Sequence, residues 1–301
     1  MHAGMPMSIS IEPTTSCNLR CPECPSGLRA FTRPTGMLQA ELFSNVLRQL
    51  DKHLMAVNFY FQGEPYLNKA LPAMIREAVS RKLFTSTSTN AHFLDDANAR
   101  ATVESGLHRL IVSVDGTTQE VYEQYRVGGS LERVLEGISR VVYWKIALKR
   151  SYPEVILQFL VVRPNEHQVE EVLEMGRKLG VDEVRYKTAQ VYEFADGNPL
   201  IPDQERYSRY QRQSNGKWKL KNKLENHCWR MWQGCVITWD GKVLPCCFDK
   251  DGAHQLGDVS QTGFREIWRH PDYTQFRQAV LSSRDQIDIC KNCSEGGKVW
   301  A

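Results

Sequence analysis

The sequence lacks long hydrophobic runs and carries little excess charge. No stretch of about 18 apolar residues occurs in the 301 residues, so we expect no membrane-spanning helix. The formal net charge is +3, which is too small to indicate a nucleic-acid partner. Residues 1–7 lack a charged segment followed by an apolar one, so they do not resemble a secretory signal. We therefore expect a cytoplasmic protein that binds neither membranes nor nucleic acid.

Cysteine, in contrast, is abundant. The sequence contains nine cysteines, and an odd number fits a framework of disulfides poorly. A reducing cytoplasm also disfavours disulfides, which leaves metal binding and catalysis as the main roles for thiols. Three of the cysteines lie close together near the N-terminus, and the other six follow residue 227. This distribution predicts two separate metal sites.

The first set is Cys17, Cys21 and Cys24, which form a Cys-x3-Cys-x2-Cys motif after the strand-like run 8–11. Structural zinc prefers four ligands, usually from separate Cys-x2-4-Cys pairs, so a lone triplet fits zinc poorly. A cubane iron–sulfur cluster has four irons, and three cysteine ligands leave one iron open to a small molecule. Three unrelated buried thiols are the remaining alternative, which such close clustering disfavours. The triplet therefore indicates a 4Fe-4S cluster.

The motif and its position resemble the radical S-adenosylmethionine (SAM) superfamily. In that family the open iron binds the amino and carboxylate groups of SAM, and the resemblance implies the same for a cluster held by Cys17, Cys21 and Cys24. The family's reduced cluster cleaves SAM to a 5′-deoxyadenosyl radical, which removes a hydrogen atom from the substrate. Many members carry an aromatic residue just before the third cysteine. Here that position is Glu23, so adenine stacking must come from another residue.

The chain between residue 8 and about residue 190 alternates short apolar runs with amphipathic helical stretches, which is typical of a parallel sheet. A full eight-unit barrel needs about 250 residues, and about 180 are present here. The pattern therefore predicts an α/β fold, a partial (β/α)6 TIM-like barrel, which is also the core fold of the family. The expected strands are 8–11, 57–61, 84–89, 110–114, 155–162 and 184–188.

Three segments are expected along the chain: a core barrel over 8–190, a connecting segment over 191–227, and a small Cys-rich domain over 228–301. In the connecting segment apolar periodicity fades, two prolines interrupt the chain, and Lys and Arg accumulate. These features predict one or two exposed helices there.

Candidate SAM-binding residues follow the expected strands, because the chemistry of a parallel barrel lies at the carboxyl ends of its strands. Gly63 and Glu64 lie in Gln62-Gly63-Glu64-Pro65 after the second strand. Glycine allows close approach of the backbone to a ligand, and a carboxylate can hold an ammonium group. The tetrapeptide resembles the family's Gly-Gly-Glu-Pro motif for the SAM amino group, with Gln62 in place of the first glycine.

The resemblance assigns roles to four further positions, of which Ser113 and Arg126 match the family in type and approximate spacing. The resemblance implies that Ser88 and Asn90, after the third strand, face SAM near its ribose. It also implies that Ser113, at the end of the fourth strand, and Arg126 contact the SAM carboxylate, for which a bidentate arginine is well suited. The alternatives are an ordinary strand-to-loop transition for the first pair and a solvent-facing arginine for Arg126.

The second set of cysteines predicts a closed, four-thiolate site. Asp240-Gly241 is a strong hairpin signal before Cys246, and Cys290-x2-Cys293 is a pair of the kind that binds iron or zinc. With Cys228 these thiols resemble the C-terminal SPASM domain in its short, single-cluster "twitch" form. The resemblance implies one auxiliary 4Fe-4S cluster, with a zinc ribbon as the alternative.

Two cysteines of the C-terminal set are left over. Cys235 is a possible replacement for one member of the quartet, and Cys247 is expected to be a spare buried thiol. In sulfatase maturases of the family a catalytic aspartate occupies the position that Cys247 holds here. That base is therefore missing, and Asp249 is only a speculative substitute.

The expected activity is a net oxidation in which the auxiliary cluster assists, with electrons supplied by a flavodoxin- or ferredoxin-type donor. The substrate is a small molecule or a peptide, since sulfatase maturases, peptide-modifying enzymes and a dehydrogenase of an aminocyclitol share this architecture. Because the expected barrel starts close to Met1, we favour a small molecule over a peptide. A peptide or protein maturase is the first alternative. A non-catalytic electron carrier is the second, although such a protein needs no SAM pocket.

Overall fold

The structure is a computed structural model that describes residues 4–50 and 52–295. The chain forms two compact units, and each unit is assembled from segments that are not contiguous in sequence. The described residues of Met1–Ser16, Ala30–Thr85 and Lys223–Ala301 make up the first unit, and Cys17–Arg29 and Ser86–Asn222 make up the second.

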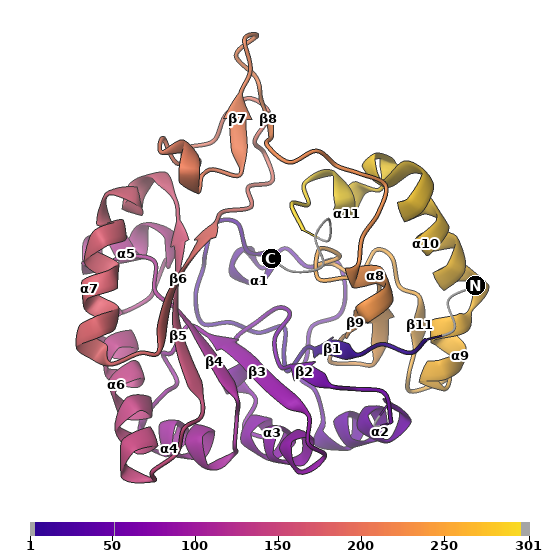
Figure 1. The fold of residues 1–301 in the computed structure, drawn as a ribbon, viewed down its shortest axis with the longest axis horizontal. Helices are drawn as coiled ribbons and strands as arrows, with labels where there is room; N and C mark the ends of the chain where they lie inside the picture. Colours follow the sequence, from indigo (N-terminus) through magenta and orange to yellow (C-terminus); the bar gives the residue numbers. More distant parts are fainter. Residues whose placement is uncertain (1–3, 51, 296–301) are drawn as a thin grey trace. The chain divides into compact units, whose positions relative to one another are not determined.

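The first unit is built on strand β1 (Ser8–Ile11), which pairs in parallel with β2 (Ala56–Asn58) on one side and with β9 (Gly234–Ile237) on the other. The C-terminal part of the chain therefore lies directly beside its first strand (Figure 1). Strand β10 (Lys242–Leu244) is antiparallel to β9 and to β11 (Gly257–Asp258). The longer helices of this unit are α2 (Ala40–Leu50), α3 (Leu71–Ser80), α9 (Phe264–Arg269) and α10 (Pro271–Ser283).

Helix α2 shows why these segments are helical. Its buried side chains are Phe43, Val46, Leu47 and Leu50, which recur at the spacing of one helix face. All four are fully buried, and Phe43 meets Phe59 at a ring-centroid distance of 5.3 Å. Burial of this one apolar face holds the helix in place.

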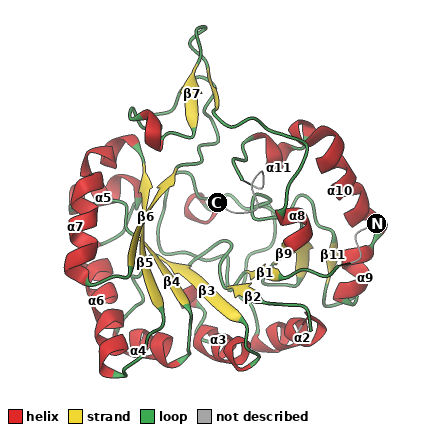
Figure 2. Cartoon of the chain, in the orientation of Figure 1, coloured by secondary structure: helices red, strands yellow, loops and turns green. Residues whose placement is uncertain are grey.

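The second unit contains the remaining parallel strands. Residues Ser86–Thr89 of β3 (Phe84–Thr89) pair with β4 (Arg109–Ser113), β4 pairs with β5 (Glu154–Val161), and β5 pairs with β6 (Glu183–Thr188). Helices α4, α6 and α7 lie along the same side of β4, β5 and β6 (Figure 2). The helices of this unit are α1 (Pro25–Leu28), α4 (Asp96–Glu104), α5 (Gln119–Tyr125), α6 (Leu131–Ala147) and α7 (Val169–Leu179).

Capping side chains define where these helices begin. The side chains of Asp95, Thr118 and Ser130 accept hydrogen bonds from backbone N–H groups in the first turns of α4, α5 and α6. Such caps satisfy N–H groups that have no partner inside the helix. The short 3-10 helix η2 (Arg163–Gln168) precedes α7 directly.

The six expected strands are present. The strands expected over 8–11 and 84–89 have the predicted bounds, and the last three begin one residue earlier than expected. The second strand is shorter than expected, since β2 ends at Asn58 and the chain leaves the sheet ahead of Gly63, whose φ is +73°. Among the described residues, none of the helices is long and apolar enough to cross a membrane.

The prediction of exposed helices in the connecting segment is wrong. The segment contains one 3-10 turn, η3 (Glu205–Tyr207), and a hairpin of β7 (Tyr210–Arg212) and β8 (Trp218–Leu220). Asn215-Gly216 forms its turn, and Gly216 has a φ of +82°. Asn-Gly between β-prone residues is a strong hairpin signal, and the accumulation of charge obscured it.

Candidate metal centres

The first candidate centre is the loop that carries Cys17, Cys21 and Cys24. The loop leads into α1, which has Cys24 at its N-cap position and Pro25 in its first turn. A Cβ atom at Gly27 would lie 2.6 Å from both the backbone N and O of Cys21, so only glycine allows α1 to fold back onto the loop. The backbone of Arg29 is left-handed, and its guanidinium donates to Cys17 O at 2.6 Å. Helix α1 therefore fixes the backbone around all three cysteines.

The three thiols share one apolar environment. Cys21 belongs to a buried hydrophobic cluster that includes Leu19 and Tyr125, and Cys17 and Cys24 pack against the same cluster. Burial raises the pKa of the Cys21 thiol, and the positive charge of Arg126 opposes part of that rise. A metal must therefore displace the proton from this thiol, as is usual when cysteine becomes a ligand.

Donor groups surround the sulfur atoms. The backbone N–H of Leu19 donates to Cys17 Sγ at 3.5 Å, Asn90 Nδ2 lies 3.8 Å from the same sulfur, and Arg126 Nη1 lies 3.8 Å from Cys21 Sγ. Donors of this kind stabilise negative charge on thiolate ligands and on the cluster they hold. Three free thiols packed on an apolar cluster and flanked by such donors fit an iron–sulfur cluster.

Arg126 is oriented by a buried carboxylate. Its Nε donates to Asp115 Oδ2 at 2.5 Å, and only 16% of the Arg126 side chain is exposed. Asp115 is fully buried, and its other oxygen accepts from Leu160 N at 2.8 Å. The amide of Asn165 donates to the backbone oxygen of Asp115 at 3.0 Å. The solvent-facing alternative for Arg126 is therefore wrong, and its guanidinium lies beside the Cys21 thiol.

Asn90 is held by a histidine that sequence reasoning missed. Asn90 Nδ2 donates to Asn18 Oδ1 at 2.8 Å, and His92 Nδ1 lies 3.0 Å from Asn90 O. The backbone N–H of Ser130 donates to His92 Nε2 at 2.8 Å, so Nε2 is unprotonated and Nδ1 carries the proton. Burial lowers the pKa of His92, which keeps the ring in this neutral form. The only signal in the sequence is the position of this histidine two residues after Asn90.

The two predicted serines lie at neighbouring strand ends. Ser88 is half-buried near the end of β3, and Ser113 is a buried residue at the end of β4. Since β3 and β4 are parallel and paired, both serines occupy the carboxyl-terminal ends of their strands, in the same unit as the cysteine triplet.

Gly63 and Glu64 belong to the first unit, where they pack on the segment just before Cys17. A Cβ atom at Gly63 would lie 2.2 Å from Thr14 O, so no other residue fits this turn. Glu64 N donates to Ser16 O at 2.7 Å. The carboxylate of Glu64 accepts from Tyr66 N at 3.2 Å and caps the 3-10 helix η1 (Pro65–Leu67). Glu64 is thus a buried carboxylate with a fixed backbone.

The second candidate centre brings the four C-terminal thiols into one neighbourhood. Cys228 precedes α8 (Arg230–Gln233), Cys246 follows β10, Cys290 lies in α11 (Asp288–Lys291), and Cys293 follows that helix. Burial raises the pKa of Cys290 to about 11; the guanidinium of Arg284 opposes this, and the thiols of Cys293 and Cys228 add to it. Cys293 likewise contributes to the raised pKa of Cys246. The four predicted ligands therefore interact electrostatically with one another.

The two remaining cysteines differ in position. Cys235 is buried in β9, burial raises its pKa, and the charge that opposes this rise is that of Arg277. Cys247 is half-buried, so the expectation of a buried thiol is wrong. The pKa of Cys246 is raised mainly by a hydrogen bond with Cys247 and, as the second cause, by burial. Of the two, Cys247 is therefore the thiol that touches a member of the predicted quartet.

Neither centre converges on a single point. Among residues 4–50 and 52–295, no group of three or more His, Cys, Asp or Glu side chains is arranged to hold one metal ion. In a cubane each thiolate binds a different iron, so the ligands surround the cluster and need not meet at one atom.

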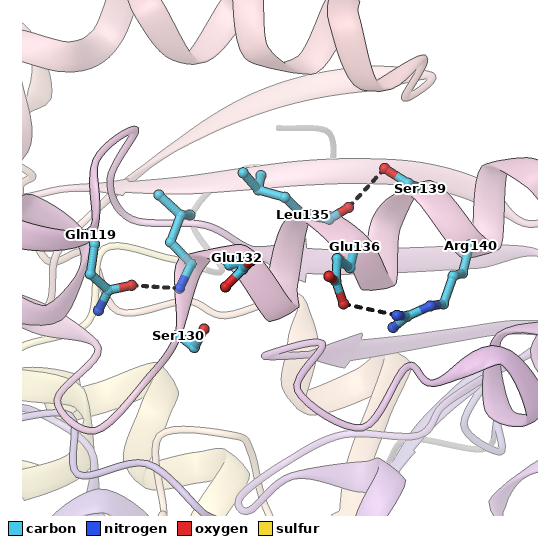
Figure 3. A pocket seen from close by; sticks show the side chains of 8 residues that line it. Gln119, Ser130, Glu132, Leu135, Glu136, Ser139 and Arg140 are labelled. Carbon is cyan, nitrogen blue, oxygen red and sulfur yellow. Dashed lines mark hydrogen bonds and ion pairs between the residues drawn. The ribbon is translucent and has the colours of Figure 1, made fainter.

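A surface hollow of about 980 Å³ lies over α6, at a distance in sequence from both sets of cysteines. Its polar groups are largely paired with one another: Gln119 accepts from the backbone N of Leu131 at 2.8 Å, and Arg140 donates to Glu136 at 2.8 Å (Figure 3). None of the residues predicted to bind iron or SAM lines this hollow. It is therefore distinct from the candidate centres.

A family comparison decides the assignment of the chain. Residues 11–176, more than half of the sequence, match the model of the radical SAM superfamily. The chain belongs to the radical SAM superfamily. Residues 228–294 also match the SPASM iron-sulfur cluster-binding domain. These matches confirm the cofactors expected from the sequence, namely a 4Fe-4S cluster with SAM and an auxiliary iron–sulfur site, and they indicate an enzyme.

Solved structures of similar radical SAM proteins confirm the fold class. BtrN in complex with AdoMet and 2-DOIA is 19% identical, with 97% of this chain and 94% of BtrN covered and a TM-score of 0.58. SuiB of Streptococcus suis bound to S-adenosylmethionine is 14% identical over 96% of this chain and 72% of SuiB, with a TM-score of 0.69. The structure of anSMEcpe with AdoMet and the Cp18Cys peptide is 17% identical over 96% of this chain and 87% of anSMEcpe, with a TM-score of 0.64. The expected α/β partial barrel followed by a Cys-rich domain is the fold that these proteins share.

Proposed function

We propose that this protein is a radical SAM oxidoreductase that removes a hydrogen atom from its substrate and completes a net oxidation with an auxiliary 4Fe-4S cluster. The observation that carries the proposal is the presence of two thiol sets with different surroundings. The first consists of three thiols flanked by side chains suited to SAM, and the second of four thiols suited to a closed coordination shell. When bound, the first cluster supplies the electron that cleaves SAM to a 5′-deoxyadenosyl radical.

The chain's own residues have distinct roles in this proposal. Cys17, Cys21 and Cys24 hold the first cluster, and the apolar residues around them exclude water. Asn90 and Arg126 are charge-stabilising donors whose positions are fixed by His92 and Asp115. The other SAM contacts in the proposal are Gly63, Glu64, Ser88 and Ser113.

The auxiliary site in the proposal consists of Cys228, Cys246, Cys290 and Cys293. A closed shell of four thiolates leaves no iron open, so this site suits electron transfer better than ligand binding. We also propose a cytoplasmic location, where a reducing environment favours metal-binding thiols, and an electron donor of the flavodoxin or ferredoxin type. We further propose the segments 8–190, 191–227 and 228–301 as the core, the connection and the auxiliary domain.

The activity is tested by SAM cleavage under anaerobic conditions. The reconstituted protein with dithionite and SAM is expected to release 5′-deoxyadenosine, and the Cys21→Ala variant is not. Cys235→Ala is the matched control, because it removes an equally buried thiol beside Arg277 and should retain cleavage. If the wild-type protein holds its clusters and releases no 5′-deoxyadenosine, it is an electron carrier and not an enzyme of this type.

Maturation of a peptide is the second candidate function. It is favoured by the similarity to SuiB, which has been solved bound to the precursor peptide SuiA, and to anSMEcpe, solved with a peptide. Asp249 does not support this candidate as a substitute base. Its carboxylate oxygens accept from Ala253 N at 2.8 Å and His254 N at 2.9 Å, so it stabilises a turn.

The two substrate classes are separated by isotope transfer. Low-mass extract from cells grown in deuterated medium is incubated with the reduced enzyme and SAM, and deuterium in 5′-deoxyadenosine is measured by mass spectrometry. If the substrate is a small molecule, deuterium still appears in 5′-deoxyadenosine when the extract has first been treated with protease. Loss of the label after protease treatment would instead identify a peptide as the substrate.

A further inference from the structure

A buried arginine reaches the C-terminal cysteines from outside the predicted ligand set. Arg284 opens the 3-10 helix η4 (Arg284–Gln286) and is only 3% exposed. Its Nη1 donates to His227 O at 2.6 Å, and its Nη2 donates to Glu295 O at 2.7 Å. Nη2 also donates to the Cys293 Sγ at 3.4 Å. The guanidinium therefore ties the segments before and after the four thiols together.

The hydrogen bonding of Arg284 is incomplete. Its Nε is buried and has no hydrogen-bond partner within the described part of the chain. Its other donors face backbone carbonyls and the thiols of Cys293 and Cys290, and across residues 4–50 and 52–295 no carboxylate forms an ion pair with it. A buried donor without an acceptor costs free energy, and so does a buried charge without a counter-charge.

Two of the other arginines near thiols form ion pairs, whereas the buried Arg277 near Cys235 contacts backbone oxygens and the rings of Trp268 and Tyr273. Arg126, next to Cys21, forms an ion pair with the buried Asp115. Arg230, which interacts with Cys228 and Cys246, forms an ion pair with Glu295, and its side chain is 52% exposed. Within the described residues, Arg284 thus combines burial, an unused Nε donor and a charge that lies against the thiols of Cys228, Cys290 and Cys293.

We infer that Arg284 is a positioning residue of the auxiliary cluster, which donates to the Cys293 thiolate and to the cluster and raises its reduction potential. The inference rests on the proposed ligand set Cys228, Cys246, Cys290 and Cys293. A cubane with four thiolates is negatively charged, and one-electron reduction makes it more negative. A desolvated cation in contact with a ligand stabilises the reduced form more than the oxidised form. Arg284 thereby favours transfer of an electron from the substrate radical to this site.

The test measures the potential of the auxiliary cluster in the full chain. Cys17, Cys21 and Cys24 are replaced by Ala, so that reconstituted iron reports on the C-terminal thiols alone. The midpoint potential is determined by titration monitored by EPR in this parent chain and after adding Arg284→Gln or Arg284→Lys. Arg265→Gln is the control, because it makes the same chemical change on the exposed face of α9.

We expect Arg284→Gln to shift the ratio of oxidised to reduced cluster at a fixed potential at least tenfold, which corresponds to a lowering of about 59 mV. Arg284→Lys retains the charge but loses the contact, so a shift of about threefold is expected. Arg265→Gln is expected to leave the potential of the parent chain unchanged.

An Arg284→Gln chain that holds its iron at the control potential overturns the inference. If that variant fails to assemble the cluster, Arg284→Lys decides: a potential equal to the control overturns the inference, and a lowered potential supports it. Loss of iron from both variants also overturns it, because a residue that only tunes the cluster is not needed for four thiolates to hold it. If the parent chain binds no iron, the ligand set itself is wrong and the inference falls with it.

Discussion

At the scale of single residues, the polar side chains around the first cluster site form chains of hydrogen bonds, each with a terminal donor at a sulfur. His92 fixes Asn90, and Asn90 reaches Cys17; Asp115 fixes Arg126, and Arg126 reaches Cys21. Side chains fixed in this way need no further ordering when a ligand binds. If Asn90 and Arg126 bind SAM as proposed, His92 and Asp115 affect SAM binding through them.

Asn90→Ala is expected to weaken SAM binding about tenfold, or about 1.4 kcal/mol, since it removes one donor beside the cluster. The measurement is the dissociation constant of SAM, obtained from the change in the EPR signal of the reduced cluster. Asn98→Ala removes a similar side-chain hydrogen bond, to Phe93 O at 2.8 Å, and should leave SAM affinity unchanged. Equal affinities in the two variants would exclude a role for Asn90 in SAM binding.

His92 makes the stability of the apoprotein depend on pH. Burial lowers its pKa below the ordinary value of 6.5, the hydrogen bond to Asn90 opposes this, and the charges of Arg133 and Arg126 lower the pKa further. The unfolded chain therefore takes up a proton that the folded chain resists, so stability is full above pH 6.5 and falls as the pH drops towards the folded pKa.

We expect the thermal midpoint of the wild-type apoprotein to fall by about 2 °C more than that of His92→Gln between pH 7.5 and 5.5, which corresponds to roughly 1 kcal/mol. Glutamine retains an acceptor for Ser130 N but does not titrate. The control is His53→Gln, because His53 is exposed. If the thermal midpoint of His92→Gln falls as much as those of the wild type and the control, His92 is not the titrating group.

At the scale of elements, short segments hold the sites in place. Helix α1 has only four residues, yet it contacts the backbone of Cys21 through Gly27 and that of Cys17 through Arg29. An element this short has little stability of its own, so its position depends on tertiary contacts. The same holds for α11, a four-residue helix that carries Cys290.

Gly27→Ala is expected to abolish iron binding by the N-terminal thiols, since the added Cβ would lie 2.6 Å from the Cys21 backbone and α1 would have to move. Iron in the reconstituted variant is expected to fall to about half of the wild-type value. Gly263→Ala adds the same methyl group at the N-cap of α9, where it meets no atom within 4 Å, and should retain all its iron. Full iron content in Gly27→Ala would contradict the role given to α1.

At the scale of the whole molecule, chain order and spatial order differ. The first unit joins the N-terminal strand to the last quarter of the chain, since β1 pairs with both β2 and β9. The cysteine triplet belongs to the second unit, whereas Gly63 and Glu64 belong to the first.

Because each cubane cluster holds four irons, two clusters predict about eight irons per chain in the anaerobically reconstituted protein. Replacing Cys17, Cys21 and Cys24 by Ala should leave about four, and replacing Cys228, Cys246, Cys290 and Cys293 should leave about four as well. Inductively coupled plasma measurements of iron and zinc provide the test. About four irons together with one zinc in the wild-type protein would replace the auxiliary cluster by a zinc ribbon.

The sequence alone determined the strands and the family and predicted the two sets of cysteine ligands, because these depend on local properties. Alternating apolar runs mark strands, and close spacing of cysteines along the chain marks a ligand set wherever that segment lies. The hairpin at Asn215-Gly216 is also determined locally, by turn chemistry that the surrounding Lys and Arg residues obscure in the sequence.

Only the tertiary structure decided which side chains act on those ligands. His92, Asp115 and Arg284 carry no motif, and the contacts that give them a role join residues far apart in sequence, as Arg126 and Cys21 are. It also decided that Cys247 contacts the predicted quartet, while Cys235 lies beside Arg277. Such contacts follow from how distant segments pack, since the packing energy is shared among many residues and leaves no pattern at any one position.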